Sequence, residues 1–180
     1  DVHGPHLIMV PKSTLSNWML EFQRWCPSIR VMKFHGSKAE REEVIKTHFK
    51  PSASHSARSW DVVVTTYEVM NLERIPLAKI AWRYLIVDEA HRLKNDKTLT
   101  AQAIQLLPTR RRVLLSGTPI QNDLDEFYSM INVCNPNILG DPSHFRRHYA
   151  MPILAAREPD ASDKELEMAG ERLRELSTIT

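Results

Sequence analysis

The stretch Tyr84-Leu-Ile-Val-Asp-Glu-Ala-His91 is a short apolar run that ends in two adjacent carboxylic acids and a histidine. Such a run is typical of a strand that is buried on both faces of a parallel sheet. Similar runs occur at 6–10, 29–34, 61–66 and 112–116, and segments between them carry apolar residues at helical spacing. Strands that alternate with helices predict an α/β fold, in which a parallel sheet is wound with helices.

The composition is that of a globular domain. Of the 180 residues, 42% are hydrophobic and 26% are charged, which excludes wholesale disorder, and the net charge of +2 predicts no particular partner. Cys26 and Cys134 lie far apart without a CxxC spacing, which favours buried thiols in a reducing compartment over a disulfide framework or a zinc site. No apolar run approaches the roughly 18 residues that a membrane span needs, so we expect an intracellular chain without a membrane partner.

The strand pattern stops at Pro136. Short helical patterns around 142–148 and 162–179 indicate an all-helical extension. We therefore divide the chain into an α/β lobe at 1–135 and a helical extension or insertion at 136–180. Because the sequence begins with Asp and stops within a helical pattern, we expect it to be a piece of a longer protein.

Asp88 and Glu89 are the strongest candidates for chemistry, because they directly follow a predicted strand. Ligands of open α/β sheets bind at the carboxyl ends of the strands, and two adjacent carboxylates there favour a cation. Mg²⁺ takes one or two protein carboxylates and fills its other positions with water and phosphate oxygens. In this interpretation Asp88 holds Mg²⁺ through water, and Glu89 orients and deprotonates the water that attacks a phosphoryl group.

Two alternatives to the magnesium site stay open at this stage. An acidic pair at a strand end is common, so Asp88 and Glu89 also fit an ordinary solvated turn. A zinc site with His91 would need a further His or Cys nearby, and neither cysteine is close in sequence.

Three further strand-end loops carry groups that suit phosphate. Hydroxyls, a lysine and exposed helix N-termini hold phosphates without reading bases. Strand-end capping and ordinary turns explain each loop about as well when it is taken alone. The residues concerned are Lys12, Ser13, Thr65, Thr66, Ser116 and Thr118.

Other aromatic and histidine residues are assigned no chemistry. Trp18 and Trp25 are seven positions apart on one face of a predicted helix, a spacing typical of core packing and not of base stacking. His35 and His48 are interpreted as core or surface groups and not as metal ligands.

Four collinear segments together resemble the first motor lobe of the Swi/Snf family of superfamily-two helicase-like DNA translocases. They are PKSTLSNWMLEFQRWCP (11–27), DVVVTTYE (61–68), WRYLIVDEAHRLKN (82–95) and RRVLLSGTPIQNDLDEFYSMINVCNP (111–136). The amino-terminal half is similar to the imitation-switch nucleosome remodellers. The carboxyl-terminal part is similar to the recombination-repair translocases, in which a helical insertion follows the first lobe.

The resemblance implies a RecA-like lobe of the DEAH-box type that hydrolyses ATP while the protein tracks along the minor groove of duplex DNA. It implies ATP and Mg²⁺ as cofactors, and double-stranded DNA as the partner, together with nucleosomes or a recombinase filament. The implied location is the nucleus, and the implied process is chromatin remodelling or recombinational DNA repair.

The same resemblance implies roles for single residues. Asp88 and Glu89 match the family's Mg²⁺-binding and water-activating acids. His91, Ser116 and Thr118 match its coupling residues. The positions that match the DNA-side motifs are Lys12, Ser13, Thr65, Thr66, Arg92 and Lys94.

Two parts of the family's motor do not occur in this sequence, the phosphate-binding GxGKT loop and the second lobe. We expect the loop within about 50 residues upstream of Asp1, and we expect the 180 residues alone to be inactive. A non-catalytic DNA- or chromatin-binding module that has lost the phosphate loop remains the alternative. An Mg²⁺-dependent phosphohydrolase that acts without nucleic acid is a third possibility.

Overall fold

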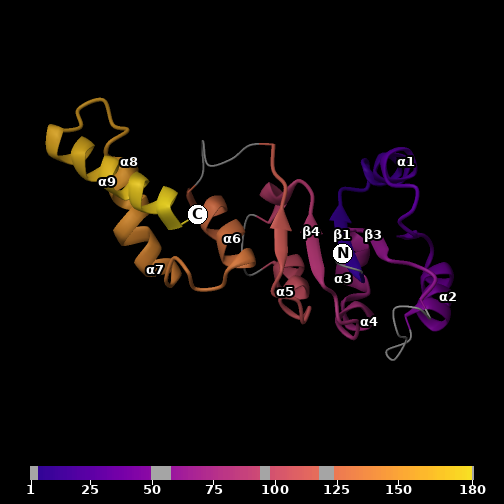
Figure 1. The fold of residues 1–180 in the computed structure, drawn as a ribbon. Helices are drawn as coiled ribbons and strands as arrows, with labels where there is room; N and C mark the ends of the chain where they lie inside the picture. The colour runs from indigo at the N-terminus through magenta and orange to yellow at the C-terminus, as the bar shows by residue number, and fades with distance from the viewer. Residues whose placement is uncertain (1–3, 50–57, 94–97, 118–123, 180) are drawn as a thin grey trace.

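A computed structural model of the chain describes residues 4–49, 58–93, 98–117 and 124–179. Its centre is a five-stranded sheet in the order β2-β3-β1-β4-β5, and all neighbouring strands are parallel (Figure 1). The α/β fold with a parallel sheet is therefore confirmed. The strands are β1 (His6–Val10), β2 (Val31–Phe34), β3 (Val62–Thr66), β4 (Tyr84–Val87) and β5 (Arg112–Leu114).

Both faces of the sheet are apolar, which explains the continuous apolar runs in the sequence. Leu7 of β1 pairs with Val63 of β3 and Leu85 of β4, and all three side chains are fully buried in the main core. Ile8, the next residue, points to the opposite face and belongs to a second cluster with Val64. The alternation follows from the two-residue period of a strand.

Helices from several parts of the chain cover the main-core face. Each contributes apolar side chains to the same cluster, so this face carries most of the hydrophobic core. The helices that pack here are α2 (Lys38–His48), α3 (Tyr67–Leu72), α4 (Arg74–Ala78), α5 (Leu99–Gln105) and the short helix η2 (Ala90–Arg92).

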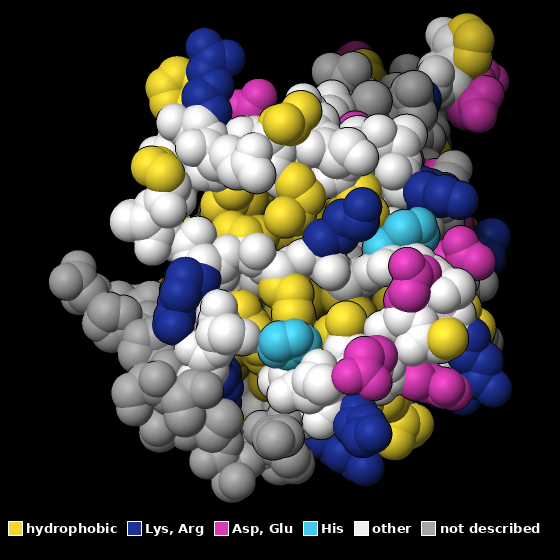
Figure 2. All heavy atoms as spheres, turned by 90° about the vertical axis from the view of Figure 1, so that its right-hand side faces the viewer, with side chains coloured by type: hydrophobic (Ala, Val, Ile, Leu, Met, Phe, Trp, Pro, Cys, Tyr) yellow, Lys and Arg dark blue, Asp and Glu magenta, His cyan; other side chains and the backbone are white. Residues whose placement is uncertain are grey.

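Helix α1 (Leu15–Trp25) covers the β1 and β3 part of the second face, where Leu15 is buried and Trp18 is half-buried. On β5 and directly after it, Val113 and Leu115 remain 40% and 39% exposed. Beside β2, a cavity of about 230 Å³ lies between α1 and the strand, and Figure 2 shows apolar side chains in hollows on this side of the molecule.

The prediction that Trp25 packs in the core is wrong. Its side chain is 67% exposed, and its indole nitrogen donates to Glu21 Oε2 at 2.6 Å. Trp25 is the last residue of α1 and does not belong to the apolar cluster that includes Leu15 and Trp18.

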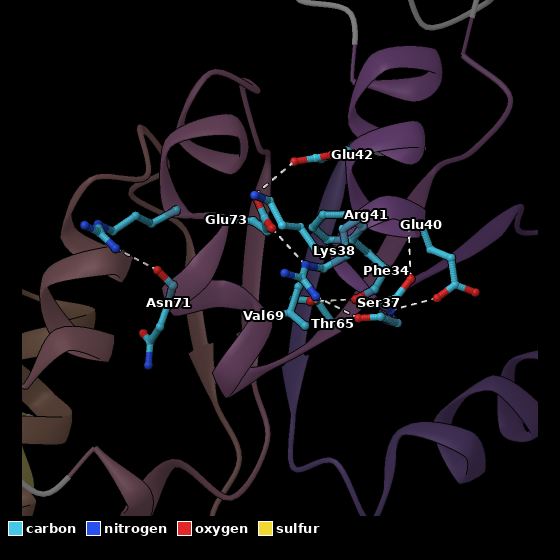
Figure 3. Close-up of polar contacts among 12 residues, drawn as sticks. Phe34, Ser37, Lys38, Glu40, Arg41, Glu42, Thr65, Val69, Asn71 and Glu73 are labelled. Atoms are coloured by element: carbon cyan, nitrogen blue, oxygen red, sulfur yellow. Dashed lines mark hydrogen bonds and ion pairs between the residues drawn. The ribbon is translucent and has the colours of Figure 1, made fainter.

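The start of α2 is fixed by a capping box, as Figure 3 shows. Ser37 Oγ accepts from Glu40 N, and Glu40 Oε2 accepts from Ser37 N at 2.7 Å. Hydrogen bonding with the Ser37 side chain, and after it with the Ser37 backbone, lowers the pKa of the Glu40 carboxyl. One residue further, the largely buried Arg41 donates from Nε to Glu73 Oε1 at 2.8 Å and from Nη1 to Gly36 O at 2.7 Å. This ion pair ties α2 to the junction between α3 and α4.

The carboxyl-terminal part is helical, as predicted, and extends away from the sheet (Figure 1). Its own core joins Phe145, Tyr149, Ile153 and Leu176 to Phe127. Phe127 lies on α6, whose Val133 belongs to the main core, so α6 contributes to both cores. The elements are α6 (Leu124–Cys134), α7 (Pro142–Phe145), the π-helical turn η3 (Arg146–Ala150), α8 (Met151–Ala155) and α9 (Asp163–Ile179). Among the helices of the described ranges, none is both long enough and apolar enough to cross a membrane.

Candidate active site at the acidic turn

The acidic turn, Asp88–Glu89, directly follows β4 at the carboxyl edge of the sheet. Both neighbouring strands hold it. Asp88 N donates to Met9 O of β1 at 2.8 Å, and Ala90 N donates to Leu115 O just after β5 at 2.8 Å. Glu89 adopts left-handed backbone dihedral angles, φ 53° and ψ 49°, which are uncommon outside glycine and cluster at functional sites.

Tyr67 stabilises this turn from the first position of α3. Its hydroxyl donates to Asp88 O at 2.6 Å and lies 3.1 Å from Glu89 O. Burial raises the pKa of Tyr67 well above its usual range, and the nearby Arg92, whose guanidinium lies 5.2 Å from the ring centroid, opposes this only in part. The phenol therefore remains a neutral hydrogen-bond donor at physiological pH.

The Asp88 carboxylate is held by one donor on each oxygen. Trp18 Nε1 of α1 donates to Oδ2 at 2.9 Å, and the backbone N–H of Glu89 donates to Oδ1 at 3.0 Å. A carboxylate has about four lone-pair positions, so two donors leave it room to bind a cation. The orientation of the group is thus fixed before any ligand binds.

The chemistry of this donor set fits Mg²⁺ better than zinc. In the described part of the chain, no three His, Cys, Asp or Glu side chains gather in a metal-binding cluster. A closed zinc site needs about four such ligands, whereas Mg²⁺ binds through one or two carboxylates plus water and phosphate. Asp88 is the residue that would hold the ion.

Glu89 is placed differently from Asp88. Its side chain is 42% exposed, and Oε2 lies 3.2 Å from His91 Nδ1, whose side chain is 35% exposed. The two groups are close enough for an ion pair but are not aligned as a hydrogen bond. Within the described part of the chain, His91 Nδ1 is buried without a hydrogen-bond partner. Glu89 is therefore free to contact a water molecule while it remains next to His91.

Ser116 lies beside the acidic turn, because the preceding residue, Leu115, is hydrogen-bonded to both Val87 and Ala90. Its hydroxyl is buried, and among the described residues it has no hydrogen-bond partner. A buried unpaired hydroxyl costs free energy unless another group pairs with it in some state of the protein. This suits the predicted coupling role, whereas Thr118 lies outside the described residues.

Lys12 and Ser13 are exposed in the loop between β1 and α1, where a phosphate could reach them. Arg92 is also exposed and follows the acidic turn, with its guanidinium over the ring of Tyr67. These placements are compatible with the predicted DNA side of the lobe. Lys94 falls outside the described residues.

The structure gives Thr65 and Thr66 another role than the predicted DNA contact. Their exposed fractions are 0% and 1%, so neither side chain is accessible. Thr65 Oγ1 donates to Phe34 O of β2 at 2.9 Å (Figure 3), and Thr66 Oγ1 accepts from Val69 N and caps α3. Strand-end capping, the alternative that the sequence left open, accounts for both.

Sequence reasoning assigned Trp18 to core packing and missed its contact with Asp88. The ring does pack, with its centroid 6.2 Å from that of Phe22, but the indole N–H reaches a carboxylate 70 positions away in sequence. The available signal was the indole N–H itself, which usually finds a partner when the ring is half-buried.

A parallel sheet with an acidic turn at its carboxyl edge is the architecture of a RecA-like lobe. A model of the SNF2-related domain matches residues 1–179. The chain therefore belongs to the SNF2-related domain family, and the resemblance inferred from the motifs is confirmed.

The relatives include both groups that the motifs indicated. The human protein "SWI/SNF-related matrix-associated actin-dependent regulator of chromatin subfamily A member 1" is 41% identical over 145 residues, which cover 81% of this chain and 13% of the relative. The rice "DNA repair and recombination protein RAD54" is 42% identical over 175 residues, which cover 95% of this chain and 17% of the relative. The chain thus spans less than a fifth of the length of these two relatives.

A solved structure agrees with the fold. The "Sulfolobus solfataricus SWI2/SNF2 ATPase core in complex with dsDNA" is 29% identical, with a TM-score of 0.69 over 93% of this chain and 32% of that chain.

Proposed function

We propose that the complete protein carrying this sequence is an ATP-dependent translocase on double-stranded DNA that acts in chromatin remodelling or recombinational DNA repair. The observation that carries the proposal is the acidic turn, in which the Asp88 carboxylate is fixed by two donors while the neighbouring Glu89 side chain stays free. A binding module without catalysis has no need for two adjacent carboxylates at this edge of the sheet. Membership of a family with remodelling and repair ATPases supports the same conclusion.

The two acids have separate tasks in the proposed reaction. Asp88 holds Mg²⁺, which supplies positive charge against the phosphate oxygens of ATP when it is bound. Glu89 orients the attacking water and accepts its proton, because its carboxylate is 42% exposed and lies beside His91. Tyr67 keeps the turn in its left-handed conformation through the two carbonyl oxygens. His91 and Ser116 lie beside the turn and are proposed to couple changes at the acidic turn to the rest of the motor.

The proposed DNA side consists of the exposed Lys12, Ser13 and Arg92. These groups can contact phosphates and carry no base-specific information, which suits a protein that moves along DNA of any sequence. A structural relative whose name includes double-stranded DNA supports duplex DNA as the partner. Nucleosomes or a recombinase filament remain the proposed larger substrates, and the nucleus is the proposed location.

The proposed organisation is an ATP-binding lobe over 1–135 and a helical extension over 136–180. Residues 1–180 do not contain the GxGKT sequence that binds triphosphate in this family. We therefore expect the 180 residues alone to hydrolyse ATP only at background, because the acidic turn needs a phosphate cradle and the cations of a second lobe.

The test is phosphate release by the complete protein, measured with and without duplex DNA beside its Glu89→Gln variant. We expect DNA-stimulated turnover in the wild type, and a rate lower by a factor on the order of 10² or more in Glu89→Gln. DNA binding without turnover in the wild type would instead identify a non-catalytic module. Turnover that DNA does not stimulate would identify a phosphohydrolase of another kind.

A further inference from the structure

We infer that Trp18 is a positioning residue that couples the Lys12–Ser13 loop to the Asp88 carboxylate. The inference rests on the proposed function and assigns a role that the sequence motifs do not give to this tryptophan. Its basis is one contact between elements, the 2.9 Å hydrogen bond from Trp18 Nε1 to Asp88 Oδ2.

Trp18 is rigidly connected to the loop that precedes α1. Its backbone N–H donates to Thr14 O at 3.0 Å, within the first turn of the helix. Thr14 in turn donates from both N and Oγ1 to Pro11 O, each at 3.1 Å, which closes the loop that contains Lys12 and Ser13. A phosphate that pulls on this loop therefore moves the first turn of α1, and Trp18 moves with it.

The indole ring has little freedom to absorb such a movement. It packs against Phe22 and belongs to the apolar cluster that includes Ile8 and Val64 of the sheet. Packing of the apolar part of the indole ring keeps the ring in place. The hydrogen bond from the N–H at its edge fixes the orientation of the ring. A displacement of α1 is transmitted to the N–H, and not lost in a change of side-chain conformation.

A movement of Trp18 acts on Asp88 Oδ2, the carboxylate oxygen that is not hydrogen-bonded within the acidic turn. Oδ1 is held by the N–H of Glu89, which belongs to the acidic turn itself, whereas Oδ2 is held by Trp18 from a different element. A shift of Trp18 therefore rotates the carboxylate relative to the turn. Because the geometry required around Mg²⁺ is strict, such a rotation changes how well Asp88 holds the ion.

Tyr67 does not connect an exposed loop to the Asp88 carboxylate. Its hydroxyl contacts the backbone carbonyls of the acidic turn and leaves the Asp88 side chain untouched. It also starts α3 directly after Thr66, which is buried and cannot receive a phosphate. Of the two aromatic residues, Trp18 is the one that connects an accessible loop to the carboxylate.

The experiment compares Trp18→Phe with Trp25→Phe in the complete protein. Both substitutions remove an indole–carboxylate hydrogen bond from α1, and Phe preserves an aromatic ring at each position. Trp25 is the matched control because its partner is Glu21 of the same helix and its side chain is exposed. The probe is a fluorescent non-hydrolysable ATP analogue, bound at increasing Mg²⁺ with and without duplex DNA.

In the wild type, we expect DNA to change the affinity for the Mg²⁺–analogue complex about 5-fold or more, as coupled sites do. In Trp18→Phe we expect the ratio of the affinities measured with and without DNA, the DNA-dependent ratio, to approach 1. The Mg²⁺ concentration for half-maximal binding of the analogue should rise about 10-fold, as it does when other residues that orient a metal ligand are replaced. Trp25→Phe should keep the wild-type values. A residue with only a packing role would lower stability without removing the DNA-dependent ratio.

A second measurement does not depend on how well Trp18→Phe folds. In the Trp25→Phe protein, binding of the Mg²⁺–analogue complex should shift the tryptophan emission, because the Trp18 indole then shares Asp88 with the ion. Of the other tryptophans within these 180 residues, Trp60 and Trp82 are 3% and 4% exposed and belong to the core on the opposite face of the sheet from α1, so their emission should change little.

The outcomes separate this inference from the proposed function. A wild type that binds the analogue without any Mg²⁺ dependence contradicts both. Mg²⁺-dependent binding with the same DNA-dependent ratio in wild type and Trp18→Phe overturns the inference alone. An unchanged emission spectrum in Trp25→Phe on addition of the complex also overturns it.

Discussion

The hydroxyl of Tyr67 donates a 2.6 Å hydrogen bond to the backbone carbonyl oxygen of Asp88, although the two residues are 21 positions apart in sequence. This bond joins the start of α3 to the acidic turn, where Glu89 has left-handed backbone angles. A glutamate is uncommon at such backbone angles, so the turn needs support from outside itself. The conformation that exposes the Glu89 carboxylate depends on a neighbouring element.

Replacing Tyr67 with Phe should therefore lower both stability and activity. The variant leaves the carbonyl oxygens of Asp88 and Glu89 without this donor, and we expect the free energy of unfolding to fall by about 1–2 kcal/mol. Urea unfolding measures the loss. Tyr84→Phe is the control, because Tyr84 lies at the start of β4 and its ring contacts His6. Equal stability of Tyr67→Phe and the wild type would contradict the assigned role.

Asp88→Asn should separate metal binding from proton transfer. The amide keeps the shape of the side chain but loses the negative charge that Mg²⁺ requires, so nucleotide binding should weaken mainly when it depends on Mg²⁺. Glu89→Gln should leave that binding nearly intact. Titration of both variants of the complete protein with ATP at several Mg²⁺ concentrations checks the difference. The assignment fails if Asp88→Asn and Glu89→Gln show the same dependence on Mg²⁺.

Lys12→Ala should weaken DNA binding equally for all sequences. Lys12 is exposed in the β1–α1 loop, and a lysine–phosphate contact carries no base information. The slope of log affinity against log salt should become shallower by about 1, the value expected for the loss of one phosphate contact. Fluorescence anisotropy with two unrelated duplexes at several salt concentrations measures this slope. Lys79→Ala, on an exposed turn after α4, serves as the control for charge alone.

Thr65→Val should lower stability and leave the affinity for DNA unchanged. The substitution removes the hydrogen bond to Phe34 O in a fully buried position, which costs about 1–2 kcal/mol. Thr65→Ser retains a hydroxyl and should recover part of the loss. Thermal unfolding and the same anisotropy titration distinguish this structural role from the DNA contact that the motifs implied. An affinity for DNA that falls in folded Thr65→Val and recovers in Thr65→Ser would restore the original interpretation.

Arg41 and Glu73 should behave as an energetically coupled pair. Their side chains are only 12% and 15% exposed, so removing Arg41 leaves a buried carboxylate without its partner, at a cost of about 3 kcal/mol. The double variant Arg41→Ala with Glu73→Ala should lose less free energy of unfolding than the sum of the losses in the two single variants. Lys38→Ala, which breaks an exposed ion pair with Glu42 on the same helix (Figure 3), should change stability little. Additive losses in the double variant would show that the pair is not coupled.

The sequence alone determined the parallel sheet and the place of the acidic turn. Continuous apolar runs identify strands buried on both faces, and the residues directly after such a run lie at the carboxyl edge of the sheet. Asp88 and Glu89 could therefore be placed at the ligand-binding edge from local sequence only. The helical end of the chain followed from spacing in the same way.

Only the tertiary structure decided which side chains reach that edge. Thr65 and Thr66 end β3, which lies between β2 and β1, so their hydroxyls are enclosed by neighbouring elements. Trp18 and Asp88 are 70 positions apart, and no local pattern records that α1 crosses the sheet close enough for an indole to reach the carboxylate. Strand and helix periodicity reports which face of an element is apolar. The partners of a polar atom on that element depend on how distant segments pack, and here that packing gives the acidic turn its two aromatic supports.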